Sequence, residues 1–86
     1  MYRVIWLDST LDDLAIIYVS CALDLQRRMV AGIDALNRRL ARNPLEEGES
    51  REGRTRLTFT GLLMVRFWVD ITDRVVQVHA VERYGR

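Results

Sequence analysis

Four arginines in the last third of the chain could together contact a phosphate-rich partner. Residues 54–84 are predicted to form three strands joined by two tight turns, because β-branched and aromatic residues fall in short runs that break near residues 60–61 and 70–73. Side chains alternate across a strand, so one face is expected to collect a polar and aromatic set: Arg54, Arg56, Thr58, Met64, Arg66, Trp68, Gln77, His79 and Arg83. If the protein binds a polyanion, this face is the expected site.

Taken one at a time, these residues have simpler interpretations. An arginine on a strand is usually a solvated side chain that discourages edge pairing, so only the shared face favours a joint role. Exposed large apolar groups usually mark a contact surface, which predicts a protein partner for Met64 and Trp68, with base stacking as the alternative. His79 has no second histidine to share a metal, so we expect neither a metal site nor a cofactor, and we assign it to the same partner-binding surface.

The composition is that of one small globular domain, residues 1–86. Thirteen basic and twelve acidic residues nearly balance, so net charge alone does not indicate nucleic acid. Arginine supplies all of the basic residues, which suits phosphate recognition but also follows from a GC-rich genome. One cysteine, Cys21, cannot form an internal disulfide, and no apolar run is long enough to span a membrane. We therefore expect a cytoplasmic protein with no membrane contact.

Two helices are predicted between a first strand candidate, residues 2–7, and the three strands. In the first helix, near Thr10–Val19, Asp8-Ser9 is expected to cap the N-terminus. Its buried stripe is expected at Leu11, Leu14, Ala15 and Tyr18, with Ile17 flanking. The second helix ends at Asn43-Pro44, since proline cannot continue a helix. Its apolar residues recur at steps of three and four: Leu25, Met29, Ile33, Leu36 and Leu40. The break at residues 20–23 fits either a helix hairpin or one bent helix.

The order of the predicted elements is β-α-α-β-β-β, and the predicted fold class is α+β. A polar, glycine-punctuated surface loop, residues 45–53, leads into the three strands. Their second face is expected to be apolar and to pack under both helices: Leu57, Phe59, Leu63, Val65, Phe67, Val69, Val76, Val78 and Ala80. The expected architecture is an antiparallel sheet with two helices on one face. The N-terminal strand must join an edge or a slot of that sheet.

Segments along nearly the whole chain resemble the RelE/ParE superfamily of toxins from type II toxin–antitoxin systems, often described as plasmid-stabilisation proteins. The resemblance rests on the order and spacing of these segments: Tyr2–Trp6, Leu11–Tyr18, Ile33–Leu36 with Leu40 and Asn43-Pro44, Gly48–Gly53, Val65–Asp70, and Arg74–Val78 with Val81. The resemblance implies the same β-α-α-β-β-β plan.

The resemblance also implies a function in growth inhibition, with two alternatives for the activity. RelE-like members cut messenger RNA in the ribosomal A site without a metal, whereas ParE-like members poison DNA gyrase. Both kinds are held inactive by a cognate antitoxin that wraps the toxin. The expected partners are therefore an antitoxin and either the ribosome with its messenger RNA or DNA gyrase. A third possibility is an inactive module that only binds its antitoxin and regulates their promoter.

The nuclease alternative can be carried over residue by residue. Metal-free RNA cleavage needs a base, cations that stabilise the phosphorane, and an acid. In RelE-like nucleases these roles are shared by basic residues and a tyrosine, for which the resemblance offers five residues: Arg54, Arg56, Arg66, Arg83 and Tyr84. Met64 stands where such nucleases have an arginine at the start of a strand, and Arg66 lies two residues further on. Because arginine does not lose its proton, Tyr84 or His79 would have to act as the base. We therefore favour inhibition by binding over cleavage.

Overall fold

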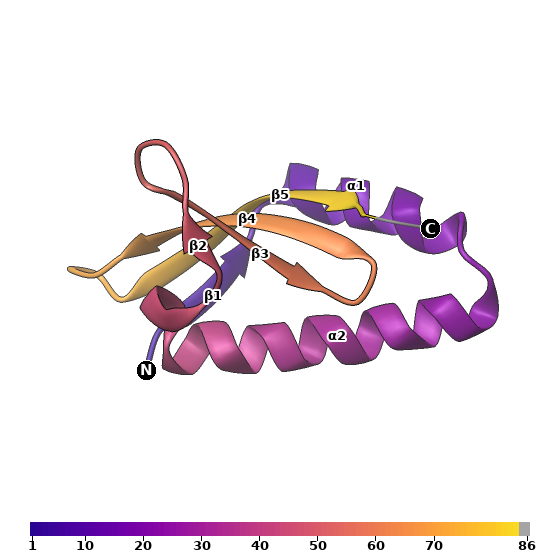
Figure 1. Cartoon of the computed structure of the whole chain (residues 1–86), viewed down its shortest axis with the longest axis horizontal. Coiled ribbons are helices and arrows are strands. Elements are labelled where there is room, and N and C mark those ends of the chain that lie inside the picture. The colour runs from indigo at the N-terminus through magenta and orange to yellow at the C-terminus, as the bar shows by residue number, and fades with distance from the viewer. Residues whose placement is uncertain (85–86) are drawn as a thin grey trace.

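The protein folds into two helices and a five-stranded sheet in a computed structural model that describes residues 1–84 (Figure 1). Residues 85 and 86, the last two of the predicted domain, lie outside the described residues. The elements are β1 (Arg3–Trp6), α1 (Asp8–Val19), α2 (Leu23–Arg42), the short helical turn η1 (Pro44–Glu46), β2 (Glu49–Ser50), β3 (Thr55–Thr60), β4 (Leu63–Asp70) and β5 (Val75–Arg83). This arrangement confirms the α+β class and the predicted order. Within the described residues, neither helix is long and apolar enough to cross a membrane.

The sheet has the strand order β1-β5-β4-β3-β2. Strands β2 to β5 pair antiparallel, as predicted for β3 to β5, but β1 pairs in parallel with β5 through Arg3↔Val75 and Trp6↔Val78. The expectation of a wholly antiparallel sheet is therefore corrected at one edge. The two-residue strand β2 was not predicted, because a pair of polar residues in a glycine-punctuated loop shows no periodicity.

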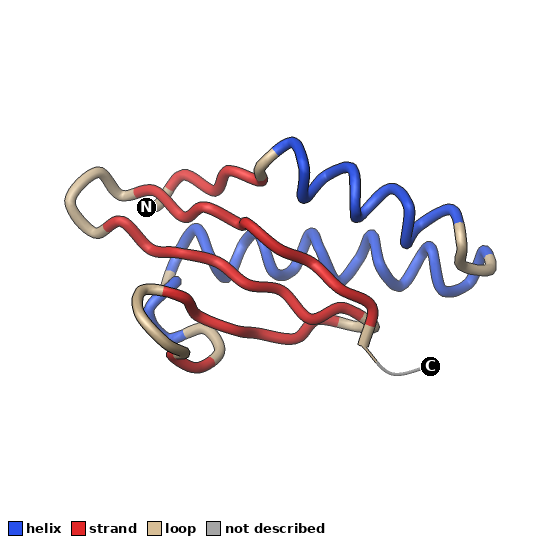
Figure 2. Tube along the Cα trace, turned by 90° about the horizontal axis from the view of Figure 1, so that it is seen from above, coloured by secondary structure: helices blue, strands red, loops and turns tan. Residues whose placement is uncertain are grey.

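Both helices pack on the same face of the sheet. Helix α2 runs along that face, and α1 continues from β1 and lies beside β5 (Figure 2). The core joins three buried side chains of α2 to six of the sheet: Met29, Leu36, Leu40, Leu63, Val65, Phe67, Val76, Val78 and Val81. The Trp6 indole N–H also donates a 2.9 Å hydrogen bond to Asn37 Oδ1, which ties β1 to α2.

Helix α2 confirms its prediction, whereas α1 corrects two details. The predicted apolar residues of α2 face the core, and the helix stops at Arg42, one residue before Asn43-Pro44. The predicted cap of α1 is wrong, since Leu7 occupies the N-cap position and makes no side-chain cap hydrogen bond. The predicted stripe is confirmed only in part: Leu14 and the flanking Ile17 pack against the core, but Leu11, Ala15 and Tyr18 are exposed while Thr10 is buried. Helix α1 is apolar on most of its sides, so its sequence does not single out one inner face.

Candidate functional site

The sheet face opposite the helices is the surface on which the predicted site residues must be located. We call this surface the open face and the other surface the helix side. Residues paired across neighbouring strands point to the same face, so the register assigns each side chain. The register assigns these residues to the open face: Arg3 and Ile5 on β1, Thr55, Leu57 and Phe59 on β3, Met64, Arg66, Trp68 and Asp70 on β4, and Val75, Gln77, Ala80 and Glu82 on β5.

The predicted faces of β3 are wrong, because they are reversed. Arg56 pairs with Phe67, Thr58 with Val65, and Thr60 with Leu63. These three apolar partners are fully buried under the helices, so the β3 residues opposite them also point to the helix side.

Polar contacts make this reversal possible. Thr60 Oγ1 donates to the carbonyl oxygen of Gly32 in α2 at 2.9 Å, and Thr58 Oγ1 donates to Glu47 Oε2 at 2.5 Å. The buried side of β3 is therefore polar but hydrogen-bonded. Its apolar residues, Leu57 and Phe59, lie on the open face.

Arg56 secures the connection between α2 and β3. Its guanidinium group donates to the carbonyl oxygens of Leu45 and Glu47 at 2.9 Å and 3.1 Å, and to Ser50 Oγ at 2.9 Å. The Glu47 carboxylate also accepts from Arg39 Nε at 2.8 Å. Burial by itself would raise the pKa of Glu47, but hydrogen bonds from Arg39 and Thr58 and the nearby positive charges outweigh it and hold that pKa below its ordinary value. The structure thus places Arg56 in a clamp on residues 44–50.

A β-bulge changes the faces along β5. Arg66 pairs with Ala80 but Phe67 pairs with Val78, so His79 is the extra residue between them. Before the bulge Val76 and Val78 face the core, and after it Val81 does. The predicted apolar-face position of Ala80 is therefore wrong.

The same shift moves Arg83 from its predicted face. It pairs with Leu63 on the helix side, where its Nη1 lies 3.8 Å from Cys21 Sγ. The expected common face for the four arginines is consequently corrected: Arg56 and Arg83 lie on the helix side, and Arg54 and Arg66 lie at or on the open face.

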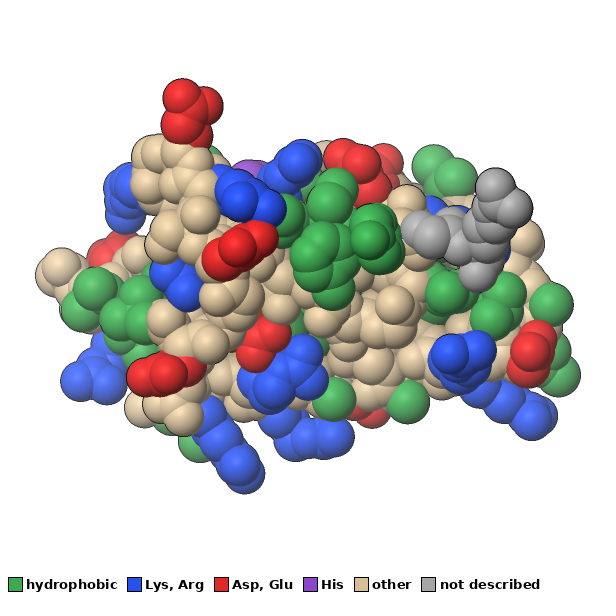
Figure 3. All heavy atoms as spheres, in the orientation of Figure 1, with side chains coloured by type: hydrophobic (Ala, Val, Ile, Leu, Met, Phe, Trp, Pro, Cys, Tyr) green, Lys and Arg blue, Asp and Glu red, His purple; other side chains and the backbone are tan. Residues whose placement is uncertain are grey.

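Aromatic rings, rather than arginines, come together on the open face. The Phe59 and Tyr84 rings are 4.8 Å apart at one end, and the Trp68 and His79 rings are 4.8 Å apart towards the other. In the space-filling view, an apolar cluster lies over β3 and β4 and is bordered by charged side chains (Figure 3). The alternation of residues along β3 did not indicate the Phe59–Tyr84 contact, because it predicted a core position for Phe59.

The cations that remain on the open face are dispersed. Arg66 Nη1 lies 3.5 Å from Glu82 Oε1, and Arg54 lies in the turn before β3. Met64 pairs with Phe59 on one side and with Glu82 on the other, so apolar and acidic groups surround the start of β4. Burial and the charge of Arg66 lower the pKa of His79, which leaves its imidazole neutral at pH 7.

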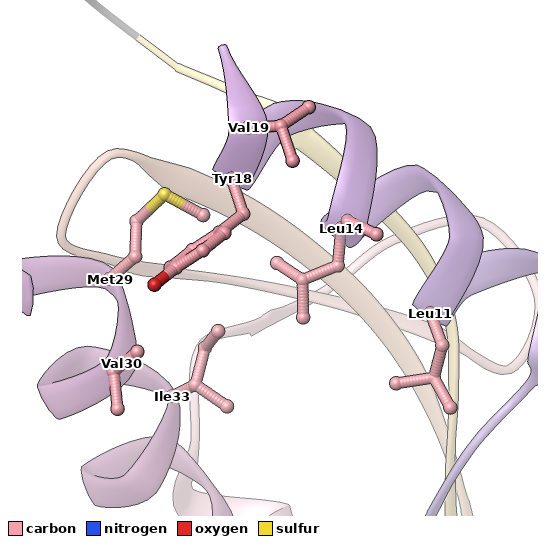
Figure 4. A pocket seen from close by; sticks show the side chains of 8 residues that line it. Leu11, Leu14, Tyr18, Val19, Met29, Val30 and Ile33 are labelled. Carbon is pink, nitrogen blue, oxygen red and sulfur yellow. The ribbon is translucent and has the colours of Figure 1, made fainter. Parts of the chain in front are cut away.

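An apolar groove of about 260 Å³ lies between the two helices (Figure 4). Its lining comes from both helices: Leu11, Leu14, Ala15, Tyr18, Val19, Met29, Val30 and Ile33. Val19 in this lining is 76% exposed, and Ile16 and Leu23, which do not line the groove, are 66% and 61% exposed. Part of this set was predicted to lie in the core, although apolar residues on most sides of α1 were a signal that the helix has a second contact. Contiguous exposed apolar side chains of this kind mark an interaction surface.

The arrangement of two helices on one face of this mixed sheet defines a small α+β domain with a RelE-like fold. The structure is similar to a chain in the crystal structure of the archaeal RelE–RelB complex from Pyrococcus horikoshii OT3. The TM-score is 0.53 with 21% sequence identity, over 99% of this chain and 97% of that chain. At this identity the similarity shows the fold alone. No family model and no curated protein matches the sequence.

Proposed function

We propose that this chain is the toxin of a toxin–antitoxin pair, which inhibits growth by binding an essential target and is neutralised by a cognate antitoxin. The observation that carries the proposal is the apolar groove on a RelE-like fold. The similar chain comes from a RelE–RelB complex, and the fold is shared over nearly the full length of both chains. A small domain that leaves so much of α1 uncovered is suited to a protein partner.

The apolar groove is the proposed antitoxin site, and its occupant is an amphipathic helix. A helix laid between α1 and α2 would cover the exposed faces of Tyr18 and Val30 and exclude water from the groove. Helix α1 contributes three acidic residues and no basic one: Asp8, Asp12 and Asp13. We therefore expect basic residues beside the apolar stripe of the antitoxin helix, because opposite charges at the rim favour the correct partner.

The proposed mode of action is binding rather than RNA cleavage. A metal-free nuclease must gather cations around the scissile phosphate. Here Arg56 is engaged by backbone carbonyl groups, Arg83 lies on the helix side, and Arg66 is paired with Glu82. These placements favour a toxin that occupies its target, with DNA gyrase as the candidate target. Ribosome-dependent cleavage is the competing activity.

Growth and target assays test the proposal in sequence. Expression of the chain alone in bacteria should arrest growth, and co-expression of the DNA-binding protein encoded beside its gene should restore it. Undisturbed growth, with the protein present in the soluble fraction, would favour the inactive antitoxin-binding module and reject the toxin. For a toxic chain, loss of gyrase supercoiling at saturating protein supports binding to gyrase. New A-site cuts in a translating ribosome extract would instead support the nuclease.

A further inference from the structure

A small hollow beside Trp68 combines an exposed aromatic ring with polar groups of defined chemistry. We call it the Trp68 hollow. Its volume is about 220 Å³, and it is lined by Arg54, Trp68, Asp70, Val75 and Gln77. It lies on the open face, whereas the apolar groove lies between the helices, so the two sites share no residue. Pockets that enclose a drug-sized ligand measure roughly 300–1,000 Å³, so this hollow suits a single flat ring system.

The Trp68 indole is held in place but remains accessible. Its Nε1–H donates to Thr55 Oγ1 at 3.3 Å, and the His79 ring packs 4.8 Å away at an interplanar angle of 42°. His79 does not line the hollow, and Trp68 is 42% exposed. An aromatic side chain fixed at its edge and open on its surface is a stacking platform for a planar ligand such as a nucleobase.

The polar groups in the hollow favour one base. Asp70 and Trp68 lie two residues apart on the same face of β4, and Gln77 is paired with Trp68 across the strands. Asp70 Oδ1 accepts a 3.0 Å hydrogen bond from the Asp73 backbone N–H, which orients the carboxylate and leaves acceptor capacity on it. A carboxylate is an acceptor only, so it selects a base edge with two adjacent donors. Among the four RNA bases, guanine alone has them, at N1–H and the 2-amino group. The Gln77 amide can donate to the neighbouring O6.

Two arginines flank the hollow and favour a ligand that carries phosphate. Arg54 lines it from the turn before β3, and among the described residues it makes no ion pair. Arg3 is exposed on the opposite side, on β1, where it pairs with Val75. A guanidinium group from a protein partner could also stack on Trp68 and pair with Asp70, but these two positive charges would oppose it. Arg54 and Arg3 therefore suit a ligand that carries a phosphate beside the base, while Asp70 is left for the base itself.

We propose that the Trp68 hollow binds one guanine nucleotide, with the base stacked on Trp68, its donor edge on the Asp70 carboxylate and its phosphate near Arg54. The nucleotide can be free or part of a single-stranded RNA, since both present the same base and phosphate. This inference goes beyond the proposed toxin function and does not depend on it.

Calorimetric titration of the full chain with GMP, AMP, CMP, UMP and guanosine tests the proposal, with quenching of tryptophan fluorescence as a second readout. GMP should bind roughly 5- to 150-fold more tightly than the other three nucleotides, because a bidentate base contact is worth about 1–3 kcal/mol. Guanosine should bind more weakly than GMP. A uridine oligomer with one guanosine, compared with the same oligomer without it, distinguishes RNA from the free nucleotide. Binding of GMP alone, or of the guanosine-containing oligomer alone, supports the proposed site.

Three substitutions locate the site. Asp70→Asn should remove the preference for GMP over AMP, while Asp73→Asn, a matched change of charge in the adjacent turn, should keep it. Arg54→Gln should reduce GMP binding to the level of guanosine. Trp68→Leu should abolish binding of both, with circular dichroism used to verify the fold. Equal binding of all four nucleotides, no binding of any guanine probe at millimolar concentration, or tighter binding of an arginine-containing peptide would overturn the proposal.

Discussion

Arg56 and Glu47 are joined twice on the helix side of the sheet: the Nε and Nη2 groups of Arg56 both donate to the carbonyl oxygen of Glu47, at 3.3 Å and 3.1 Å. The connection from α2 to β3 is thus stabilised by the Arg56 side chain as well as by backbone pairing between β2 and β3. Gly48 lets this connection pass close to β3, since its φ is +64° and a Cβ there would clash with the Leu57 carbonyl group.

Substitution of Arg56 should destabilise the fold, whereas substitution of Arg54 should not. Hydrogen bonds that involve a charged group each contribute about 1.5–3 kcal/mol, and Arg56→Ala leaves several acceptors without their donor. We expect Arg56→Ala to lower the free energy of unfolding by about 2–3 kcal/mol. Arg54→Ala at an exposed turn should change it by less than about 0.5 kcal/mol. Urea denaturation measures both, and equal effects would contradict the assigned role of Arg56.

The Glu47 carboxylate should make stability depend on pH. Its pKa in the folded state lies below the ordinary value of 4.5, so its contribution is fully present above that value and is lost as the pH falls through the folded pKa. The difference in unfolding free energy between the wild type and Glu47→Gln should therefore shrink between pH 7 and pH 3. Urea denaturation at several pH values measures it. Glu49→Gln, at an exposed carboxylate paired with Arg51, is the control and should show little change. A constant difference for Glu47→Gln would refute the prediction.

Two phenylalanines on neighbouring strands should differ in their effect on stability. Phe67 is fully buried on the helix side, whereas Phe59 is 45% exposed on the open face. Phe67→Ala should cost about 3–5 kcal/mol. Phe59→Ala should cost about 1 kcal/mol, mainly through loss of its contact with the Tyr84 ring. Thermal and urea unfolding provide the comparison, and a cost for Phe59→Ala as large as that for Phe67→Ala would mean that the assigned face of β3 is wrong.

A charge placed in the apolar groove should block antitoxin binding without unfolding the chain. Val19 and Val30 line the groove and are 76% and 50% exposed, so Val19→Glu and Val30→Glu leave the core intact. Each should weaken the complex with the antitoxin by tenfold or more, because a buried unpaired charge is costly. Ile71→Glu, in the turn between β4 and β5, is the matched control, because Ile71 is 61% exposed, between the two groove residues. Binding is measured by titration calorimetry, and unchanged affinity in both groove variants would exclude the groove as the antitoxin site.

The elements with a regular pattern could be predicted from the sequence. Helix α2 repeats its apolar residues at helical spacing and ends at a proline. Strand β4 alternates between buried and more exposed residues along most of its length, and its predicted apolar residues face the helices. These two elements supply most of the core, so the fold class and the element order followed from them.

The residues of the open face could not all be predicted, because two local features change the face to which side chains point. On β3, the buried residues Thr58 and Thr60 are polar, so hydrophobic alternation selected the wrong face. Hairpin geometry held the missing signal: a two-residue loop that begins with Gly61, at φ +56°, pairs Thr60 with Leu63 and so assigns both to one face. On β5, the bulge at His79 has no comparable signal in a run of β-branched residues. One extra residue was enough to move Arg83 to the opposite face.

The parallel pairing of β1 with β5 affects how the protein is made. Strand β1 and both helices are synthesised before Val75–Val78, the segment that β1 must bind. During translation these early segments leave the ribosome without the strand that completes their sheet. The sheet therefore cannot close until β5 has been made, and its closure joins β1 to a strand far along the sequence.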